Sequence, residues 1–263
     1  MERKLVFFDI DGTLVSDDSE HIIPSSARKA VRQLGQSGSY ALINTGRSYF
    51  NVDENIKSLG FDGYACGCGT HIILEGEEIY YRTIPKDECL RLRDMIKKAD
   101  AAPLYERRDK FFYDTASRDI GWIGKLKRLY KEQGKTVTND AQDEDFSFDK
   151  FCIWYDEKTD MDFFHREISE GYDFIDRGEG FAEIVPKDCS KATAMTVIAE
   201  KLGIDREDIF AIGDSLNDLP MLKAAGTGIC IGKNNLLWKQ ADYVADELRN
   251  DGLAKALEHF GLI

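Results

Sequence analysis

Residues 4–18, KLVFFDIDGTLVSDD, combine an apolar run with two acids at its end. The run Leu5–Phe8 is typical of a strand buried on both faces, and Asp9 and Asp11 follow it at once. Burial of two neighbouring carboxylates is unfavourable unless a cation or a reaction compensates for it. The end of this first strand is therefore where we expect the chemistry of the protein.

The regions on either side of a central stretch alternate short apolar runs with helical stripes. Ala27, Ala30 and Leu34 repeat at helical spacing after the first strand, and residues 40–47 predict a second strand with a polar end. This alternation indicates the α/β class, with a doubly wound parallel (Rossmann-like) sheet. The other expected elements are helices in 50–60, 195–202, 217–226, 235–241 and 251–261, strands in 61–67, 208–215, 227–232 and 242–245, and a β-hairpin in 71–82.

The central stretch breaks this alternation. Helical stripes there mix with strand-like runs at 110–115 and 150–156, and the two are separated by polar, acidic sequence. We expect residues 84–185 to form an inserted α+β cap domain. Residues 1–83 and 186–263 would then form the catalytic core.

The overall composition excludes several classes of partner. Acidic residues outnumber basic residues, 48 against 35, which gives a net charge of −13, so we expect no nucleic acid and no membrane as partner. No stretch approaches the roughly 20 apolar residues of a membrane span, and acids follow the N-terminal apolar run too soon for a signal peptide. The six cysteines show no zinc spacing, and we expect them to be buried thiols in a reducing cytoplasm.

Several predicted strands end in an acid or a hydroxyl. In an open parallel sheet, ligands bind outside the carboxyl ends of the strands, so Asp9, Asp11, Thr45 and Asp214 should converge. Carboxylates from two strands make an oxygen-rich pocket that suits a hard cation, and Mg²⁺ fits it best. We therefore expect a bound Mg²⁺ where these strands end.

These motifs together resemble the haloacid dehalogenase (HAD) superfamily of aspartate-nucleophile phosphatases. DIDGT at 9–13, TGR at 45–47, Lys191 and GDSLND at 213–218 carry the resemblance, which extends over nearly the whole chain. The large insertion before Lys191 resembles the Cof-type subfamily, whose cap is a separate domain. The resemblance implies a hydrolase with a metal-binding site.

The resemblance also implies a role for each acid. Asp9 would attack phosphorus and form an aspartyl-phosphate, and Asp11 would protonate the leaving alcohol and later deprotonate the hydrolytic water. Mg²⁺ would be held by Asp9, the backbone carbonyl of Asp11 and Asp214. Asp218 would act on the metal through water or would orient Lys191.

The phosphoryl group would be held by a second set of residues. A phosphate ester dianion repels a carboxylate nucleophile, so a metal and a lysine must offset charge as the group transfers. Lys191 would be this third catalytic residue, and Arg47 would reach the substrate. The phosphoryl oxygens would bind Thr45, Lys191, Asn217 and the backbone N–H groups of Ile10 and Gly46.

The expected function is Mg²⁺-dependent hydrolysis of small phosphorylated metabolites, with sugar phosphates as the leading class. The same residues would serve a mutase that transfers the phosphoryl group to another sugar hydroxyl. A phospho-accepting receiver domain also uses clustered acids, Mg²⁺, a Thr and a Lys, but it needs only about half this length and no inserted domain. A catalytically idle sugar-phosphate sensor is a further alternative, against which the intact acid pair argues. The individual substrate and the oligomeric state have no readable signal in the sequence.

Overall fold

The protein divides into two compact units. The computed structural model describes residues 3–18, 20–233 and 236–263. The first unit comprises the chain up to Arg47, Asn51–Tyr81 and Cys189–Ile263, and the second comprises Ser48–Phe50 and Arg82–Asp188. The expected bounds of the inserted stretch, 84–185, lie within a few residues of Arg82–Asp188, but Ser48–Phe50, which were expected in the core, belong to the second unit. The assignment of the inserted stretch as a cap domain stays a prediction.

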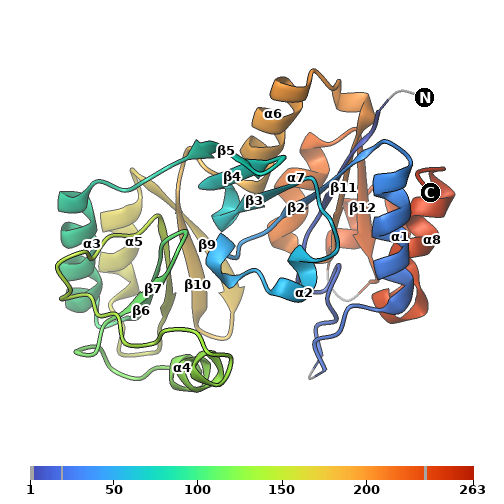
Figure 1. Cartoon of the computed structure of the whole chain (residues 1–263). Coiled ribbons are helices and arrows are strands. Elements are labelled where there is room, and N and C mark those ends of the chain that lie inside the picture. Colours follow the sequence, from blue (N-terminus) through green and yellow to red (C-terminus); the bar gives the residue numbers. More distant parts are fainter. Residues whose placement is uncertain (1–2, 19, 234–235) are drawn as a thin grey trace. The chain divides into compact units, whose positions relative to one another are not determined.

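The first unit is built on an eight-stranded sheet (Figure 1). The strands from β13 to β3 in the spatial order run parallel, and β4 and β5 extend the sheet as an antiparallel hairpin. This arrangement confirms the predicted α/β class with a doubly wound parallel sheet. In spatial order the strands are β13 (Tyr243–Ala245), β12 (Thr227–Ile231), β11 (Ile209–Gly213), β1 (Leu5–Phe8), β2 (Tyr40–Asn44), β3 (Gly63–Cys66), β4 (His71–Leu74) and β5 (Glu77–Tyr81).

Helices cover both faces of this sheet (Figure 1). Leu5 and Phe7 of β1 pack in one buried cluster with Met195 and Ile198 of α6, and α7 contributes to the same cluster. On the opposite face α1 packs beside α8. The α-helices of this unit are α1 (Ser25–Gln36), α2 (Glu54–Lys57), α6 (Lys191–Leu202), α7 (Leu219–Ala224) and α8 (Gly252–His259). Short 3₁₀ helices lie at Tyr49–Asn51, Gly67–Gly69, Arg206–Asp208, Leu216–Asp218, Leu236–Lys239 and Leu248–Asn250.

Local backbone conformation explains where the sequence interpretation holds and where it does not. The hairpin in 71–82 is confirmed, because Glu75 and Gly76 take φ angles of 50° and 82°, which suit a tight hairpin turn. The helix expected over 50–60 is limited to α2, since Asp53 is still extended (φ −70°, ψ 148°). The helix expected over 235–241 is a 3₁₀ helix at Leu236–Lys239, and residue 235 lies outside the described residues.

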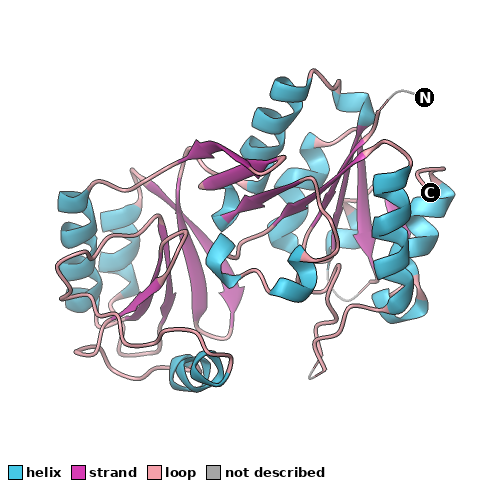
Figure 2. Cartoon of the chain, in the orientation of Figure 1, coloured by secondary structure: helices cyan, strands magenta, loops and turns pink. Residues whose placement is uncertain are grey.

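The second unit has an antiparallel five-stranded sheet with helices on both faces, which confirms its α+β character (Figure 2). Side chains alternate along β8: Phe151 and Ile153 pack in a cluster with α3 and α5, whereas Cys152 and Trp154 pack in a cluster with α4. In spatial order the strands are β7 (Phe111–Tyr113), β6 (Ala102–Glu106), β8 (Lys150–Trp154), β10 (Phe181–Pro186) and β9 (Tyr172–Gly178); the helices are α3 (Lys86–Ala99), α4 (Ile123–Glu132) and α5 (Met161–Ile168).

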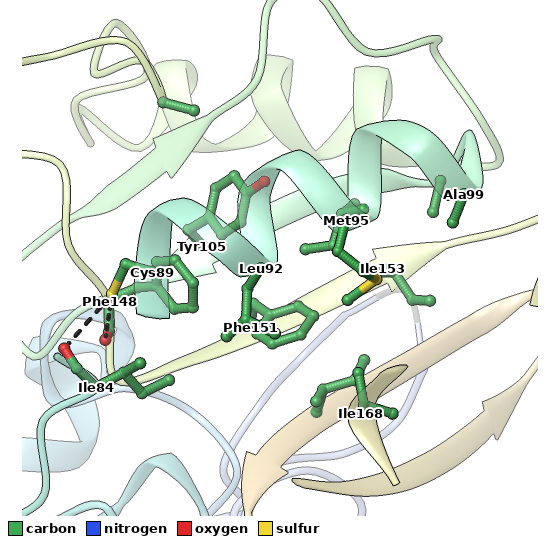
Figure 3. Close-up of a cluster of buried hydrophobic side chains, with 14 of the residues drawn as sticks. Ile84, Cys89, Leu92, Met95, Ala99, Tyr105, Phe148, Phe151, Ile153 and Ile168 are labelled. Carbon is green, nitrogen blue, oxygen red and sulfur yellow. Dashed lines mark hydrogen bonds between the residues drawn. The ribbon is translucent and has the colours of Figure 1, made fainter. Parts of the chain in front are cut away.

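Figure 3 shows the cluster between this sheet and α3. Leu92 of α3 and Phe151 of β8 are fully buried in it, and burial of side chains of this size stabilises a fold by about 2–3 kcal/mol each. The thiol of Cys89 donates to the carbonyl oxygens of Ile84 at 3.5 Å and Phe148 at 3.8 Å. These contacts anchor the start of α3 to the loop that precedes β8.

Two further expectations concern the whole chain. All six cysteines are buried with free thiols, as the sequence predicted. Within the described ranges, none of the helices combines the length and the apolar character that crossing a bilayer requires.

Candidate active site

Three carboxylates from distant parts of the chain meet at the carboxyl end of the core sheet. β1 and β11 are parallel neighbours, and the N–H of Asp9 donates to the carbonyl of Ile212 at 2.9 Å. Asp9 and Asp214 directly follow these two strands, and Asp218 belongs to the next 3₁₀ helix. One oxygen atom from each of Asp9, Asp214 and Asp218 lies within 4.8 Å of the other two.

Lys191 lies between two of these acids. Its Nζ donates to Oδ1 of Asp9 at 2.6 Å and to Oδ1 of Asp218 at 2.5 Å. The lysine is only 3% exposed and Asp218 is fully buried, so these charges interact with little screening by water. The ammonium group therefore crosslinks the acid at the end of β1 to the acid in the 3₁₀ helix after β11.

The start of α6 fixes the backbone of Lys191. Ser190 and Thr193 form a capping box: the N–H of Thr193 donates to the Ser190 hydroxyl at 3.0 Å, and the N–H of Ser190 donates to the Thr193 hydroxyl at 2.8 Å. The side-chain amide of Asn44, at the end of β2, donates to the carbonyl oxygen of Lys191 at 2.8 Å. Lys191 is thus held by its own helix and by a neighbouring strand.

Two glycines make room for the carboxylates. A Cβ atom on Gly12 would lie 2.4 Å from the carboxylate of Asp214, and the φ of Gly12 is 81°. A Cβ atom on Gly213 would lie 2.5 Å from Cβ of Asp218. The carboxylate of Asp218 also accepts from the N–H groups of Asp214 at 3.1 Å and Ser215 at 3.2 Å. The motifs around both acids therefore require glycine for steric reasons.

The electrostatics of the cluster favour a bound cation. Burial, and then the charge of Asp218, raises the pKa of Asp9 to about 7. Burial, and then the charges of Asp9 and Asp218, raises the pKa of Asp214 to about 8. Burial opposes the charge on Lys191, but the charges of Asp218 and Asp9 outweigh it and hold the lysine pKa above its usual range. When all three acids are ionised, they and the one lysine carry a net charge of −2, and oxygen ligands of this kind fit Mg²⁺.

The expected phosphate-binding residues follow the same strands as the carboxylates or a neighbouring strand. Thr45 directly follows β2 and is 1% exposed, and its hydroxyl accepts from the N–H of Arg47 at 3.1 Å. The carbonyl of Ile10 closes a tight loop after β1 by accepting from the N–H groups of Leu14 at 2.9 Å and Val15 at 2.8 Å. The Oδ1 atom of Asn217 accepts from the hydroxyl of Ser215. Thr45 and Gly46 thus belong to the loop after β2 and Ile10 to the loop after β1, and Asn217 belongs to the 3₁₀ helix after β11.

The side chains of Asp11 and Arg47 form an ion pair outside the three-carboxylate group. Arg47 Nε donates to Asp11 Oδ2 at 2.9 Å, and Nη2 donates to Oδ1 at 2.5 Å. Burial opposes the charge on Arg47, but its hydrogen bonds with Asp11 and the charges of Asp11 and Asp53 hold its pKa above the usual range. The side chain of Asp11 is thus bound by Arg47, and its expected metal contact is the one through the backbone carbonyl. Arg47, which we expected to contact the substrate, contacts Asp11 in this structure.

Three residues of this region were given no role by the sequence interpretation. Asn44 holds the backbone of Lys191, and the hydroxyl of Thr13 donates to Oδ1 of Asp214 at 3.1 Å. Asp53 accepts from Arg47 Nη1 at 3.1 Å. Thr13 lies inside the DIDGT motif and Asn44 directly precedes Thr45, so their positions carried a signal. The position of Asp53 carried no such signal in the sequence, because its contact with Arg47 depends on the loop conformation.

We expect Asp214→Asn to stabilise the protein in the absence of metal. The pKa of Asp214 is about 8 in the folded state against 3.8 as its ordinary value, so between these values the unfolded chain releases a proton that the folded chain keeps. Rising pH therefore disfavours the folded wild type. In urea unfolding with EDTA, the variant should gain about 1–3 kcal/mol at pH 8 and progressively less towards pH 5.

At saturating Mg²⁺ the wild type should be more stable to unfolding than Asp214→Asn, because the ion binds the folded wild type more tightly than the folded variant. Equal stability of the two proteins at pH 8 in EDTA would show that Asp214 bears no electrostatic strain.

Comparison with known proteins gives the family. Residues 6–257 match the family described as haloacid dehalogenase-like hydrolase. YkrA of Bacillus subtilis (strain 168) is 30% identical over 272 residues, and the alignment covers 100% of both chains. A second protein of the same strain, 5-amino-6-(5-phospho-D-ribitylamino)uracil phosphatase YcsE, is 28% identical over 263 residues, covering 100% of this chain and 97% of YcsE.

Solved structures agree with this result. BT1666 from Bacteroides thetaiotaomicron, a phosphatase of the HAD superfamily, superposes with a TM-score of 0.84 at 27% identity, covering 99% of this chain and 96% of BT1666. BT4131, described as a HAD subclass IIB sugar phosphatase, gives a TM-score of 0.83 at 26% identity, covering 99% and 100% of the two chains. The resemblance inferred from the motifs is thereby confirmed. The chain belongs to the haloacid dehalogenase-like hydrolases and is a phosphatase of that superfamily.

Proposed function

We propose that the protein is a Mg²⁺-dependent phosphatase that hydrolyses small phosphorylated metabolites, foremost sugar phosphates, through an aspartyl-phosphate on Asp9. The observation that carries this proposal is the contact of Lys191 with both Asp9 and Asp218 beside Asp214. It combines a nucleophile, a fixed positive charge and a set of oxygen ligands in one buried cluster. The description of BT4131 as a sugar phosphatase and the name of YcsE support a small phosphorylated substrate.

The residues present suit a magnesium ion. Asp9, Asp214 and the backbone carbonyl of Asp11 would hold it, with Asp218 acting through water or through Lys191. When bound, Mg²⁺ would neutralise negative charge on the phosphoryl oxygens and on the nucleophile. The net charge of the cluster and the raised pKa values of Asp9 and Asp214 support this assignment.

The chain's own groups would carry out two displacements at phosphorus. A carboxylate oxygen of Asp9 attacks phosphorus, the bond from phosphorus to the ester oxygen breaks, and Asp11, protonated and released from its ion pair with Arg47, gives its proton to that oxygen. Water then attacks the aspartyl-phosphate, Asp11 takes a proton from it, and Asp9 leaves as a carboxylate. Throughout both steps the ammonium group of Lys191 offsets the charge of the phosphoryl oxygens.

The remaining phosphate-binding residues would orient the phosphoryl group. Thr45, Asn217 and the backbone N–H groups of Ile10 and Gly46 supply hydrogen-bond donors. Preorganised donors of this kind stabilise charge without the reorganisation that water would need. We also propose a cytoplasmic location, which the six free thiols support.

A screen of phosphorylated metabolites with and without Mg²⁺ tests the proposal. We expect release of inorganic phosphate from sugar phosphates with Mg²⁺, a loss of at least about 100-fold in kcat with EDTA, and full recovery on adding Mg²⁺ back. The control is the same screen with Asp9→Asn. Activity that is indifferent to EDTA, or transfer of the phosphoryl group to a second sugar without phosphate release, would contradict it.

A further inference from the structure

The side chain of Asn44 joins two elements that carry expected phosphate-binding groups. Asn44 is the last residue of β2 and directly precedes Thr45, whereas Lys191 is the first residue of α6. Nδ2 of Asn44 donates to the backbone carbonyl oxygen of Lys191 at 2.8 Å, across 147 positions of the sequence. The contact therefore ties the end of a core strand to the residue whose ammonium group binds Asp9 and Asp218.

The strand side of this contact is held by neighbouring backbone. Asn44 pairs with Ala65 in the parallel ladder of β2 and β3. The N–H of Thr45 donates to the carbonyl oxygen of Ala65 at 2.9 Å, and the carbonyl oxygen of Thr45 accepts from the N–H of Cys68 at 3.0 Å. The side chain of Asn44 thus extends from a backbone that the next strand, and the 3₁₀ helix after it, keep in place.

The helix side of the contact does not need Asn44 in order to form. An α-helix directs each backbone carbonyl toward the N–H four residues on, so the carbonyl of Lys191 faces Met195 within α6. The capping box of Ser190 and Thr193 already begins the helix. The bond from Asn44 is therefore an additional one at this carbonyl. What it adds is a fixed position of the start of α6 against β2.

Local stability does not explain an asparagine at this place. Its side chain is fully buried, and within residues 3–18, 20–233 and 236–263 no group donates a hydrogen bond to its Oδ1. A buried polar atom without a partner destabilises a folded protein, and an apolar side chain would avoid this effect. The hydrogen bond from Nδ2 to Lys191 is the contact that does account for the amide.

We propose that Asn44 is a positioning residue that holds the start of α6 so that the ammonium group of Lys191 meets the phosphoryl oxygens in the transition state. This inference rests on the proposed function, in which Lys191 offsets charge at phosphorus. Asp9 and Asp218 hold Nζ of the lysine in the free enzyme. Once an oxygen of Asp9 bonds to phosphorus, Nζ exchanges this partner for the phosphoryl oxygens. Its place then depends on Asp218 and on the backbone that Asn44 holds.

A displaced ammonium group should affect the transition state more than a bound anion. In the transition state the attacking oxygen, phosphorus and the leaving oxygen lie in line, so the phosphoryl group cannot move toward a displaced charge. A free phosphate ion in the site can shift and keep the contact. Loss of the bond from Asn44 should therefore weaken binding of the transition state more than binding of phosphate.

The experiment compares Asn44→Ala and Asn44→Thr with the control Asn55→Ala. Threonine suits a strand, but its hydroxyl is attached one atom nearer to the backbone and falls short of the Lys191 carbonyl. Asn55 is an exposed asparagine in α2. For each protein with Mg²⁺ we would measure kcat/KM for p-nitrophenyl phosphate and inhibition by two anions, phosphate and orthovanadate. Orthovanadate adopts the five-coordinate geometry of the transition state.

We expect both Asn44 variants to lower kcat/KM about 10- to 30-fold and to weaken orthovanadate binding by a similar factor, with phosphate weakened less than about threefold. Asn55→Ala should match the wild type. The melting temperature of Asn44→Ala without metal should equal or exceed that of the wild type, because the buried amide oxygen is removed. In the Lys191→Met background, Asn44→Ala should change kcat/KM less than about twofold, since its effect passes through the lysine.

Equal weakening of phosphate and orthovanadate would overturn the inference, and so would wild-type kcat/KM in both Asn44 variants. A loss of the same size in the Lys191→Met background, or a marked fall in melting temperature for both variants, would show that Asn44 serves the fold instead. A loss with Asn44→Ala that is absent from Asn44→Thr would assign the effect to packing. Failure of the proposed function gives a different result, since Asp9→Asn would then stay active.

Discussion

Asp9→Asn should lower kcat by roughly 10⁴-fold or more without unfolding the protein. The amide is a poor nucleophile toward phosphorus and lacks the negative charge that helps to bind a divalent cation. The fold should persist, because the substitution keeps the shape of a side chain that is 5% exposed and Lys191 retains its contact with Asp218. Steady-state kinetics with Mg²⁺ and urea unfolding of the same preparation check both parts of this expectation.

The matched control for this variant is Asp17→Asn. Asp17 lies in the loop that follows the same strand, is exposed, and is expected to keep wild-type activity. Substantial turnover by Asp9→Asn would mean that another group attacks the phosphate. The cluster of Asp9, Asp214 and Asp218 would then need a different interpretation.

Lys191→Met should weaken both activity and stability. Methionine matches the length of the lysine stem, so the change removes chiefly the charge. Asp9 and Asp218 would then lie buried without their shared cation, and breaking a buried ion pair from one side destabilises a protein by about 3–5 kcal/mol. We expect a loss of about this size in urea at pH 8 without metal, and a roughly 10³-fold lower kcat/KM, because the phosphoryl oxygens lose their fixed positive charge.

The loss of stability should shrink toward pH 5. The pKa of Asp9 is already raised to about 7 with the lysine present, so without it the acids take up protons as the pH falls and the unfavourable charge disappears. Lys201→Met, an exposed position near the other end of α6, is the control and should leave both quantities unchanged. A Lys191→Met protein as stable as the wild type at pH 8 would contradict the account of the cluster.

The meeting of Asp9 with Asp214 was predictable from the sequence. Each acid directly follows an apolar run, and parallel strands bring such positions to one edge of a sheet whatever their separation in the chain. The same reasoning covers Thr45, which directly follows another strand of that sheet. Strand order decides how close they come: β1 and β11 are neighbours in the sheet, so the two acids lie side by side.

The partner of Arg47 was not predictable in this way. A long, charged side chain in a loop reaches many positions, and only the conformation of residues 51–53 decides that Asp53 faces it. Asp53 was part of the helix expected over 50–60, which gave no reason to pair it with Arg47. In the structure α2 begins at Glu54, directly after Asp53, and the backbone of Asp53 is extended.

Several strands of the second unit also escaped the sequence interpretation. β6 contains Pro103, which usually marks a loop or a strand edge, although this strand lies inside the sheet between β7 and β8. β9 is an edge strand with charged residues at Asp173, Asp176 and Arg177, so its apolar pattern is weak. The register of such strands depends on tertiary pairing more than on local preference.

The central claim, that Asp9 becomes phosphorylated, is tested most directly by trapping the intermediate. The enzyme is mixed with a sugar phosphate and Mg²⁺, quenched during turnover, reduced with borohydride and digested for peptide mass analysis. Reduction of an acyl phosphate converts the aspartate into homoserine, and we predict this conversion at position 9 alone. Homoserine at another aspartate would contradict the account. So would an unmodified Asp9 in an enzyme that releases phosphate and whose intermediate is trapped efficiently on another residue.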